Sequence, residues 1–284
     1  PVPSVLLTFD GTTAVCSAVC RGDRTTDRVS AFDVVLPTPV PQKGMVLNKL
    51  SQFWFQLTED IVPNHVVSFD VKDMPEEFSK EQYKDRVVLV KKLKMLPYEF
   101  IIRGYMFGSM WKAYQKKEPF CGQVITGEYE LAQKLEKPML TPSTKATEGH
   151  DEYSVTHEGL VKDLGADLAN QLETACLKLF ETCYDYAYER GIIIADTKLE
   201  FGLDEAGKLV LADEVFTPDS SRFWNREEYK VGTSPLSYDK QYLRDWLTDN
   251  KLAGVTPAPD LPDEVVAKTQ EKYLECLDRL VPKA

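Results

Sequence analysis

The hydrophobic positions of this chain change their spacing along its length. Short apolar or β-branched runs predict strands at Val5–Phe9 and Val87–Val90, and a third strand is expected at Glu99–Tyr105, after the break at Pro97. The first third of the chain is therefore expected to be rich in sheet.

Helical spacing is found later in the chain. Apolar side chains recur every three or four positions over residues 168–187, and Gly191 stands where a C-terminal cap is expected. Residues 266–280 repeat this spacing after Pro262. Because helices and strands occur in separate runs, the pattern predicts a mixed α+β fold.

Two further segments lie between these elements. Ile192–Gly202 and Lys208–Val215 flank a turn signal at residues 204–207 and are predicted to form a β-hairpin. Upstream, Thr141–Asp151 has no sustained periodicity and is predicted to be a long surface loop. Long loops in compact domains often carry function.

Composition narrows the possible classes of protein. The 284 residues, 43% of them hydrophobic, are enough for a sizeable core in two domains or in one domain with two lobes. The net charge of −11 argues against general binding to nucleic acid or to anionic membranes, so an anionic substrate would need a local basic pocket. No apolar run reaches the roughly 18 residues that span a bilayer and no signal peptide is visible, so the expected location is the cytoplasm.

The predicted hairpin carries two carboxylates, Glu200 and Asp213, at similar distances from its turn. Strand pairing would bring them close together, and Mg²⁺ accepts one or two carboxylates together with substrate phosphates. The alternative is a pair of solvated charges, which the spacing alone favours. A one-residue slip of the register would place the two groups on opposite faces.

Other polar positions are arranged in a way that suits an anionic ligand. Asp196 and Lys198 share a strand face with Glu200, and such a polar stripe is costly unless it faces a site. Arg103, near two glycines, and Arg222, after a hydroxyl-rich loop, could each grip a phosphate or carboxylate. Each piece could equally be an ordinary turn or surface residue.

Seven sequence blocks occur in the order in which SAICAR synthases carry them. Together they resemble the longer form of that family: DRVSAFD (27–33), QKG and NKLSQFWF (42–55), RGYMFGSMWKAY (103–114), TPSTKA and HDE (141–152), ADTKLEFG (195–202), DEVFTPDSSRFW (213–224) and DKQYLRDWL (239–247). The resemblance runs from about Asp27 to the C-terminal helix.

The resemblance implies an α+β fold with two lobes, related to ATP-grasp enzymes and protein kinases, with ATP bound between a sheet-rich lobe (1–96) and a larger lobe (97–284). It also implies an enzyme of de novo purine biosynthesis that uses ATP and Mg²⁺. That enzyme joins L-aspartate to 5-amino-1-(5-phospho-ribosyl)imidazole-4-carboxylate (CAIR) through an acyl phosphate, giving the succinocarboxamide SAICAR, ADP and phosphate. The expected partners are these small molecules, with no nucleic acid or membrane, and the expected state is a monomer or a homodimer.

The resemblance also assigns roles to residues at matching positions. The implied metal ligands are Glu200 and Asp213, and the implied catalytic residues are Lys198, Asp196 and Arg222. The implied nucleotide-side residues also include the connection between the lobes, Lys94, Met95 and Leu96. The implied substrate-binding residues are Arg103, Ser109, Asp219, Ser221 and Arg222, with Asp33, Lys43, Lys145 and Asp151 lining the substrate side.

One segment departs from the family pattern. Where the family has a glycine–lysine segment similar to GKVRD and then an apolar strand, residues 21–26 run straight into Asp27. We expect residues of a mobile ATP lid around Gly22 to be missing from the sequence, because deletion of a central strand would expose the neighbouring sheet. If the gap is genuine, the chain is instead a catalytically inactive binding module. A kinase is a further alternative, but no HRD or DFG motif is present.

Overall fold

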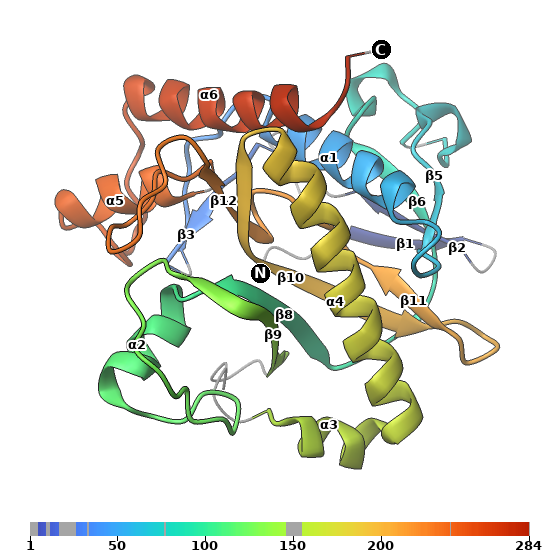
Figure 1. Cartoon of the computed structure of the whole chain (residues 1–284). Helices are drawn as coiled ribbons and strands as arrows, with labels where there is room; N and C mark the ends of the chain where they lie inside the picture. Colours follow the sequence, from blue (N-terminus) through green and yellow to red (C-terminus); the bar gives the residue numbers. More distant parts are fainter. Residues whose placement is uncertain are drawn as a thin grey trace.

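Figure 1 shows the chain as a computed structural model, which describes residues 5–9, 12–16, 27–32, 34–76, 78–145, 155–238 and 240–283. For the first two ranges only the backbone is described. The confirmed fold class is α+β, because the described part combines three β-sheets with helices that pack on them.

The N-terminal sheet has the strand order β1-β2-β6-β5. Its strands are all antiparallel to their neighbours: β1 (Val5–Phe9), β2 (Thr12–Cys16), β5 (Val66–Ser68) and β6 (Val87–Lys91). The strand predictions at Val5–Phe9 and Val87–Val90 are thus confirmed. The same part of the chain holds a small ribbon, β3 (Ser30–Ala31) with β4 (Val34–Val35), the helix α1 (Lys43–Leu57) and two 3₁₀ turns, Val71–Asp73 and Glu81–Tyr83.

The central sheet is built around one long strand, β10 (Ile192–Leu203). One edge of β10 pairs with β12 (Ser221–Asn225) and β11 (Leu209–Ala212), and the other pairs with β8 (Tyr98–Tyr105) and β7 (Lys94–Met95). The predicted hairpin and the strand near Glu99–Tyr105 are therefore confirmed. The second arm of the hairpin ends at Ala212, three residues earlier than predicted, because Asp213 has a left-handed φ of 61°.

The outer strand of this sheet corrects one prediction. The segment Thr141–Thr144, expected to be part of a surface loop, belongs to β9 (Lys134–Thr144), which pairs with β8. Pro138 and Pro142 obscure the strand pattern. Within the described residues β8 is the one strand that pairs with β9, so a proline nitrogen on the opposite side of β9 costs no ladder hydrogen bond. Residues 146–151 of the predicted loop lie outside the described residues.

The helix α4 (Ala166–Glu189) covers one face of the central sheet. In Figure 1, α4 runs across the face formed by β8 and β10, next to α3 (His157–Leu164). The remaining helices are α2 (Gly108–Lys116), α5 (Gln241–Asp249) and α6 (Asp263–Leu280). Both predicted helices are confirmed, each beginning two or three residues earlier than the apolar spacing indicates.

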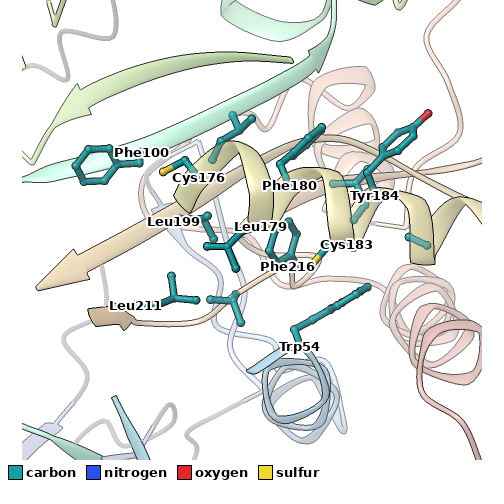
Figure 2. Packing of buried hydrophobic residues seen from close by; sticks show 14 of the residues in the cluster. Trp54, Phe100, Cys176, Leu179, Phe180, Cys183, Tyr184, Leu199, Leu211 and Phe216 are labelled. Carbon is teal, nitrogen blue, oxygen red and sulfur yellow. The ribbon is translucent and has the colours of Figure 1, made fainter. Parts of the chain in front are cut away.

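The main core forms between α4 and the sheet. Figure 2 shows Leu179 and Cys183 of α4 directed toward Leu199 and Phe216, with Trp54 of α1 below them. The Trp54 and Phe216 rings lie 5.6 Å apart, so α1 contributes to the core of the larger predicted lobe as well as lying beside α6. The division at residue 96 remains a prediction.

No helix in the described part of the chain has the length and apolar character needed to cross a membrane.

Candidate active site

Asp196 lies on β10 between two arginines from neighbouring strands. Its Cα register partners are Arg103 on β8 and Arg222 on β12. Arg222 makes a short ion pair with Asp196, and the Arg103 guanidinium lies 4.0 Å from the same carboxylate. Two guanidinium groups thus share one carboxylate, so this end of the strand carries an excess of positive charge.

Neighbouring residues fix both guanidinium groups. Arg103 donates to the Thr141 hydroxyl at 3.0 Å. Gly108 lies against the Arg222 guanidinium. A Cβ at this position would be only 3.1 Å from the guanidinium, and the φ of Gly108, 63°, also favours glycine. Ser109 follows in the first turn of α2, so the structure brings this predicted residue to the Arg222 side of the site.

Lys198, two positions further along the same face of β10, is surrounded by acidic side chains. Its ammonium lies 2.8 Å from Glu200, 3.3 Å from Glu99 and 3.5 Å from Asp213. Burial lowers the pKa of Lys198, but the charges of Asp213, Glu200 and Glu99 outweigh it and hold the pKa above its ordinary value. Lys198 is therefore a fixed cation.

The two predicted metal ligands both contact Lys198. In the hairpin register Glu200 pairs with Ala212 rather than with Asp213, and the left-handed turn at Asp213 returns its carboxylate to the side of Glu200. Lys145, at the end of β9, makes a short ion pair with Glu200. The structure thus brings together four residues that the sequence singled out, which are Lys145, Lys198, Glu200 and Asp213.

The pKa values of Glu200 and Asp213 are shifted in opposite directions. Burial raises the pKa of Glu200, but the Lys198 charge and the Lys145 hydrogen bond lower it by more, so the pKa of Glu200 lies below its usual range. Burial and the charge of Glu200 raise the pKa of Asp213. A second cation near both carboxylates would relieve their mutual repulsion.

The donor set at this point fits a magnesium ion. Glu99, Glu200 and Asp213 supply three carboxylates against the two ammonium groups of Lys198 and Lys145, which leaves an excess of negative charge. Carboxylate oxygens are the ligands that Mg²⁺ prefers, and it commonly completes its shell with phosphates and water. In the described part of the chain no group of three or more His, Cys, Asp or Glu is arranged to hold a metal by itself.

A second basic pair surrounds Asp219, in the loop between β11 and β12. Lys43 at the start of α1 lies 2.8 Å from the Asp219 carboxylate, and Lys240 lies 2.9 Å from it. Asp219 also accepts a hydrogen bond of 2.6 Å from the Tyr273 hydroxyl. Lys43 and Asp219 were predicted as site residues, whereas sequence reasoning missed Lys240 and Tyr273, although Lys240 stands within the block DKQYLRDWL.

Glu214 is another residue that sequence reasoning missed. It follows Asp213 directly and accepts a hydrogen bond of 2.8 Å from the Thr217 hydroxyl. Burial, together with the charges of Asp219 and Asp213, raises the pKa of Glu214 to about 7. Its place inside the block DEVFTPDSSRFW was the signal that could have identified it.

Ser221 and the connection between the predicted lobes lie on either side of β10. The Ser221 hydroxyl is buried and lies 2.7 Å from that of Thr197, so it fixes β12 against β10. On the other edge the Leu96 N–H donates to Phe201 at 2.9 Å, while Lys94 and Met95 are exposed. Asp33, Asp151 and the expected lid around Gly22 lie outside the described residues.

The fold and the site together define a class of protein. One strand face carries a pair of arginines for an anion and, beside it, a lysine–carboxylate cluster suited to a metal and phosphates. This is the arrangement of an α+β enzyme that handles phosphorylated small molecules.

Sequence comparison identifies the particular family. A family model described as SAICAR synthetase matches residues 23–259. The phosphoribosylaminoimidazole-succinocarboxamide synthase of Methylobacillus flagellatus is 48% identical over 261 residues, which cover 90% of this chain and 87% of that protein. The chain therefore belongs to the SAICAR synthetase family.

Solved structures agree with this membership. A SAICAR synthase from Saccharomyces cerevisiae, complexed with SAICAR, has a TM-score of 0.86 and 41% identity and covers 98% of this chain and 92% of its own. A SAICAR synthetase in complex with ADP has a TM-score of 0.68 and 25% identity, covering 98% and 96% of the two chains.

Proposed function

We propose that this chain is an ATP-dependent ligase of purine biosynthesis that joins L-aspartate to CAIR and releases SAICAR, ADP and phosphate. The observation that carries the proposal is the single face of β10, where Asp196 lies between two arginines and Lys198 lies next to Glu200 and Asp213. Family membership supports it, as do the related structures solved with SAICAR and with ADP.

The chemistry explains why these residue types are needed. A carboxylate is a poor acyl donor, so the CAIR carboxylate first attacks the γ-phosphorus of ATP, the bond to the bridging oxygen of ADP breaks, and an acyl phosphate forms. The aspartate amine then attacks the acyl carbon, phosphate leaves, and the nitrogen loses a proton. Fixed positive charges offset the charge that develops on the phosphoryl oxygens, so positioning and electrostatics supply most of the catalysis.

The nucleotide side of the site is assigned to the Lys198 cluster. Glu200 and Asp213 would hold Mg²⁺, which supplies charge neutralisation at the ATP phosphates, and Lys198 would orient the transferred group. Lys94–Leu96, which pair with β10 beside this cluster, would line the adenine side.

The substrate side is assigned to the arginine pair and the loop before β12. Arg103 and Arg222, oriented by Asp196, would bind anionic groups of CAIR in a fork-like geometry, assisted by Ser109 and Ser221. Further residues that we assign to the substrate side are Asp33, Lys43, Lys145, Asp151 and Asp219. We further propose that the protein acts in the cytoplasm as a monomer or a homodimer.

A turnover assay tests the proposal. Purified protein is given ATP and MgCl₂ with CAIR, L-aspartate, both or neither, and ADP and SAICAR are measured. We expect ADP release to require both substrates and to match SAICAR formation. ADP release without aspartate would indicate a kinase, and nucleotide binding without turnover would indicate an inactive binding module.

A pair of lysine variants makes the assay specific for this site. Lys198→Met removes the ammonium that contacts three carboxylates, and we expect at least a hundredfold loss of turnover. Lys208→Met, at the exposed turn of the same hairpin, should retain normal turnover. Equal activity of the two variants would contradict the assignment of Lys198.

A further inference from the structure

Asp219 lies where four separate parts of the chain meet. Its carboxylate contacts the start of α1 through Lys43, the residue before α5 through Lys240, and the middle of α6 through Tyr273. We propose that Asp219 positions Lys43 and Lys240 in the active site, and that Tyr273 on the C-terminal helix positions Asp219. The inference rests on the proposed function, whose substrate side includes Lys43 and Asp219, and it adds Lys240 to that side.

The hydrogen-bond pattern separates the two oxygens of Asp219. Oδ2 accepts from both ammonium groups, at 2.8 Å from Lys43 and 2.9 Å from Lys240. Oδ1 accepts from the Tyr273 hydroxyl at 2.6 Å, and the Asp219 N–H donates to Thr217 at 3.2 Å. Protein groups thus hold both oxygens and the backbone, so the direction in which Oδ2 points is fixed.

Charge makes a positioning role the better chemical fit for Asp219. Burial raises its pKa, but the charges of Lys240 and Lys43 lower it well below the usual range, so the group is an anion. An anion would repel a substrate phosphate or carboxylate, whereas it attracts ammonium groups. Two ammonium groups around one carboxylate leave an excess positive charge, which repeats the arrangement of two arginines around Asp196.

Tyr273 is well placed to act through Asp219 rather than on the substrate. Its side chain is fully buried, and α6 is anchored in the main core by Cys276 and Leu280. Its ring also lies beneath Lys43, with the ammonium 5.6 Å from the ring centroid. The hydroxyl therefore couples a rigid helix far along the chain to the lysines, and its loss should let Asp219 and both ammonium groups move.

The test compares two tyrosines that each bear a buried ring and a bonded hydroxyl. Tyr273→Phe removes the donor to Asp219. Tyr238→Phe is the matched control, because Tyr238 is also buried and donates to Glu275 of the same helix, at 3.0 Å, away from Asp219. We expect Tyr273→Phe to raise the KM for CAIR about tenfold and to leave the KM for ATP within twofold, since a poorly placed cation weakens binding on one side of the site only. The control should leave both values within twofold.

A second measurement does not depend on turnover. Acetylation by acetic anhydride, followed by peptide mass spectrometry, reports the accessibility of Lys43 and Lys240, whose side chains are 4% and 13% exposed. Both should react at least threefold faster in Tyr273→Phe and in Asp219→Asn than in the wild type, relative to the exposed Lys162, and the control should match the wild type.

The outcomes distinguish the two levels of the proposal. Wild-type protein that makes no SAICAR would contradict the proposed function, while faster acetylation in Tyr273→Phe would still support the positioning role. Unchanged acetylation in both Tyr273→Phe and Asp219→Asn would overturn the positioning role whatever the turnover. A parallel rise of the KM for CAIR and the KM for ATP in Tyr273→Phe would also overturn it, because a general loosening of the fold moves both.

Discussion

At the residue scale, the site contains two carboxylates that each orient a pair of cationic side chains. Asp196 does so for Arg103 and Arg222, and Asp219 does so for Lys43 and Lys240. Such sharing lets an acidic protein, with a net charge of −11, build local positive pockets. The fixed geometry also means that the identity of each cation matters, not only its charge.

Arg222→Lys tests the importance of the guanidinium shape. The variant keeps the charge but loses the planar fork that Gly108 and Asp196 hold in place, so we expect the KM for CAIR to rise roughly tenfold. Arg226→Lys, at the residue directly after β12, serves as the control, because the Arg226 side chain contacts the carbonyl and the ring of Tyr188 rather than Asp196. Steady-state kinetics decide the matter, and an unchanged KM in Arg222→Lys would mean that charge alone suffices.

Asp213→Asn tests the metal assignment. The amide keeps the size of the side chain and removes one negative charge from the cluster around Lys198, so the Mg²⁺ concentration for half-maximal turnover should rise at least tenfold. Glu205→Gln, an exposed carboxyl at the turn of the same hairpin, should leave it unchanged. Normal magnesium dependence in Asp213→Asn would show that the carboxylate does not hold the metal.

At the element scale, α4 and β10 form the rigid base of the site. The buried face of α4 packs on the side of the sheet formed by β8 and β10, as Figure 2 shows for Leu179 and Leu199. Asp196, Lys198 and Glu200 alternate along the strand that this helix supports, so their relative positions depend on the packing beneath them.

Leu179→Ala tests this support. Leu179 is fully buried, so its truncation should lower the free energy of unfolding by about 2–5 kcal/mol, the usual cost of a core cavity. Leu177→Ala, on a partly buried position of the same helix, should cost clearly less. Urea unfolding measures both values, and equal losses would argue that α4 does not pack as described.

At the scale of the whole molecule, residues 63–65 connect the N-terminal sheet to the central sheet. The His65 N–H donates to Leu211 of β11 at 3.0 Å, and its carbonyl accepts from Lys91 of β6 at 2.7 Å. The His65 side chain is buried against Phe55, and burial lowers its pKa from 6.5 to about 4, although a hydrogen bond to the Asp213 backbone partly opposes this.

This histidine should make folding stability depend on pH. The unfolded chain takes up a proton near pH 6.5, whereas the folded chain resists it until about pH 4, so the native state loses stability as the pH falls through this window. Relative to His65→Gln, the wild type should lose ~2 kcal/mol of unfolding free energy between pH 7.5 and pH 5. His157→Gln, with a side chain 48% exposed in the wild type, is the control, and a constant difference between wild type and His65→Gln would contradict the prediction.

The sequence by itself determined the features that depend on local periodicity. The spacing of apolar residues predicted α4 and α6, and alternation along one strand placed Asp196, Lys198 and Glu200 on one face. These predictions succeeded because helix and strand periods are properties of consecutive residues. The ordered motif blocks added the family, which the comparisons confirmed.

Only the tertiary structure decided which distant residues meet. Strand pairing brought Arg103 to Asp196, and helix packing brought Tyr273 to Asp219. The spacing of residues within a single helix or strand predicts neither of these two contacts. The strand β9 also escaped prediction, because its prolines look like loop residues until β8 supplies a partner on one side. Register and packing depend on the whole fold, and for that reason the sequence supplied the chemical groups of the site while the structure alone determined their partners.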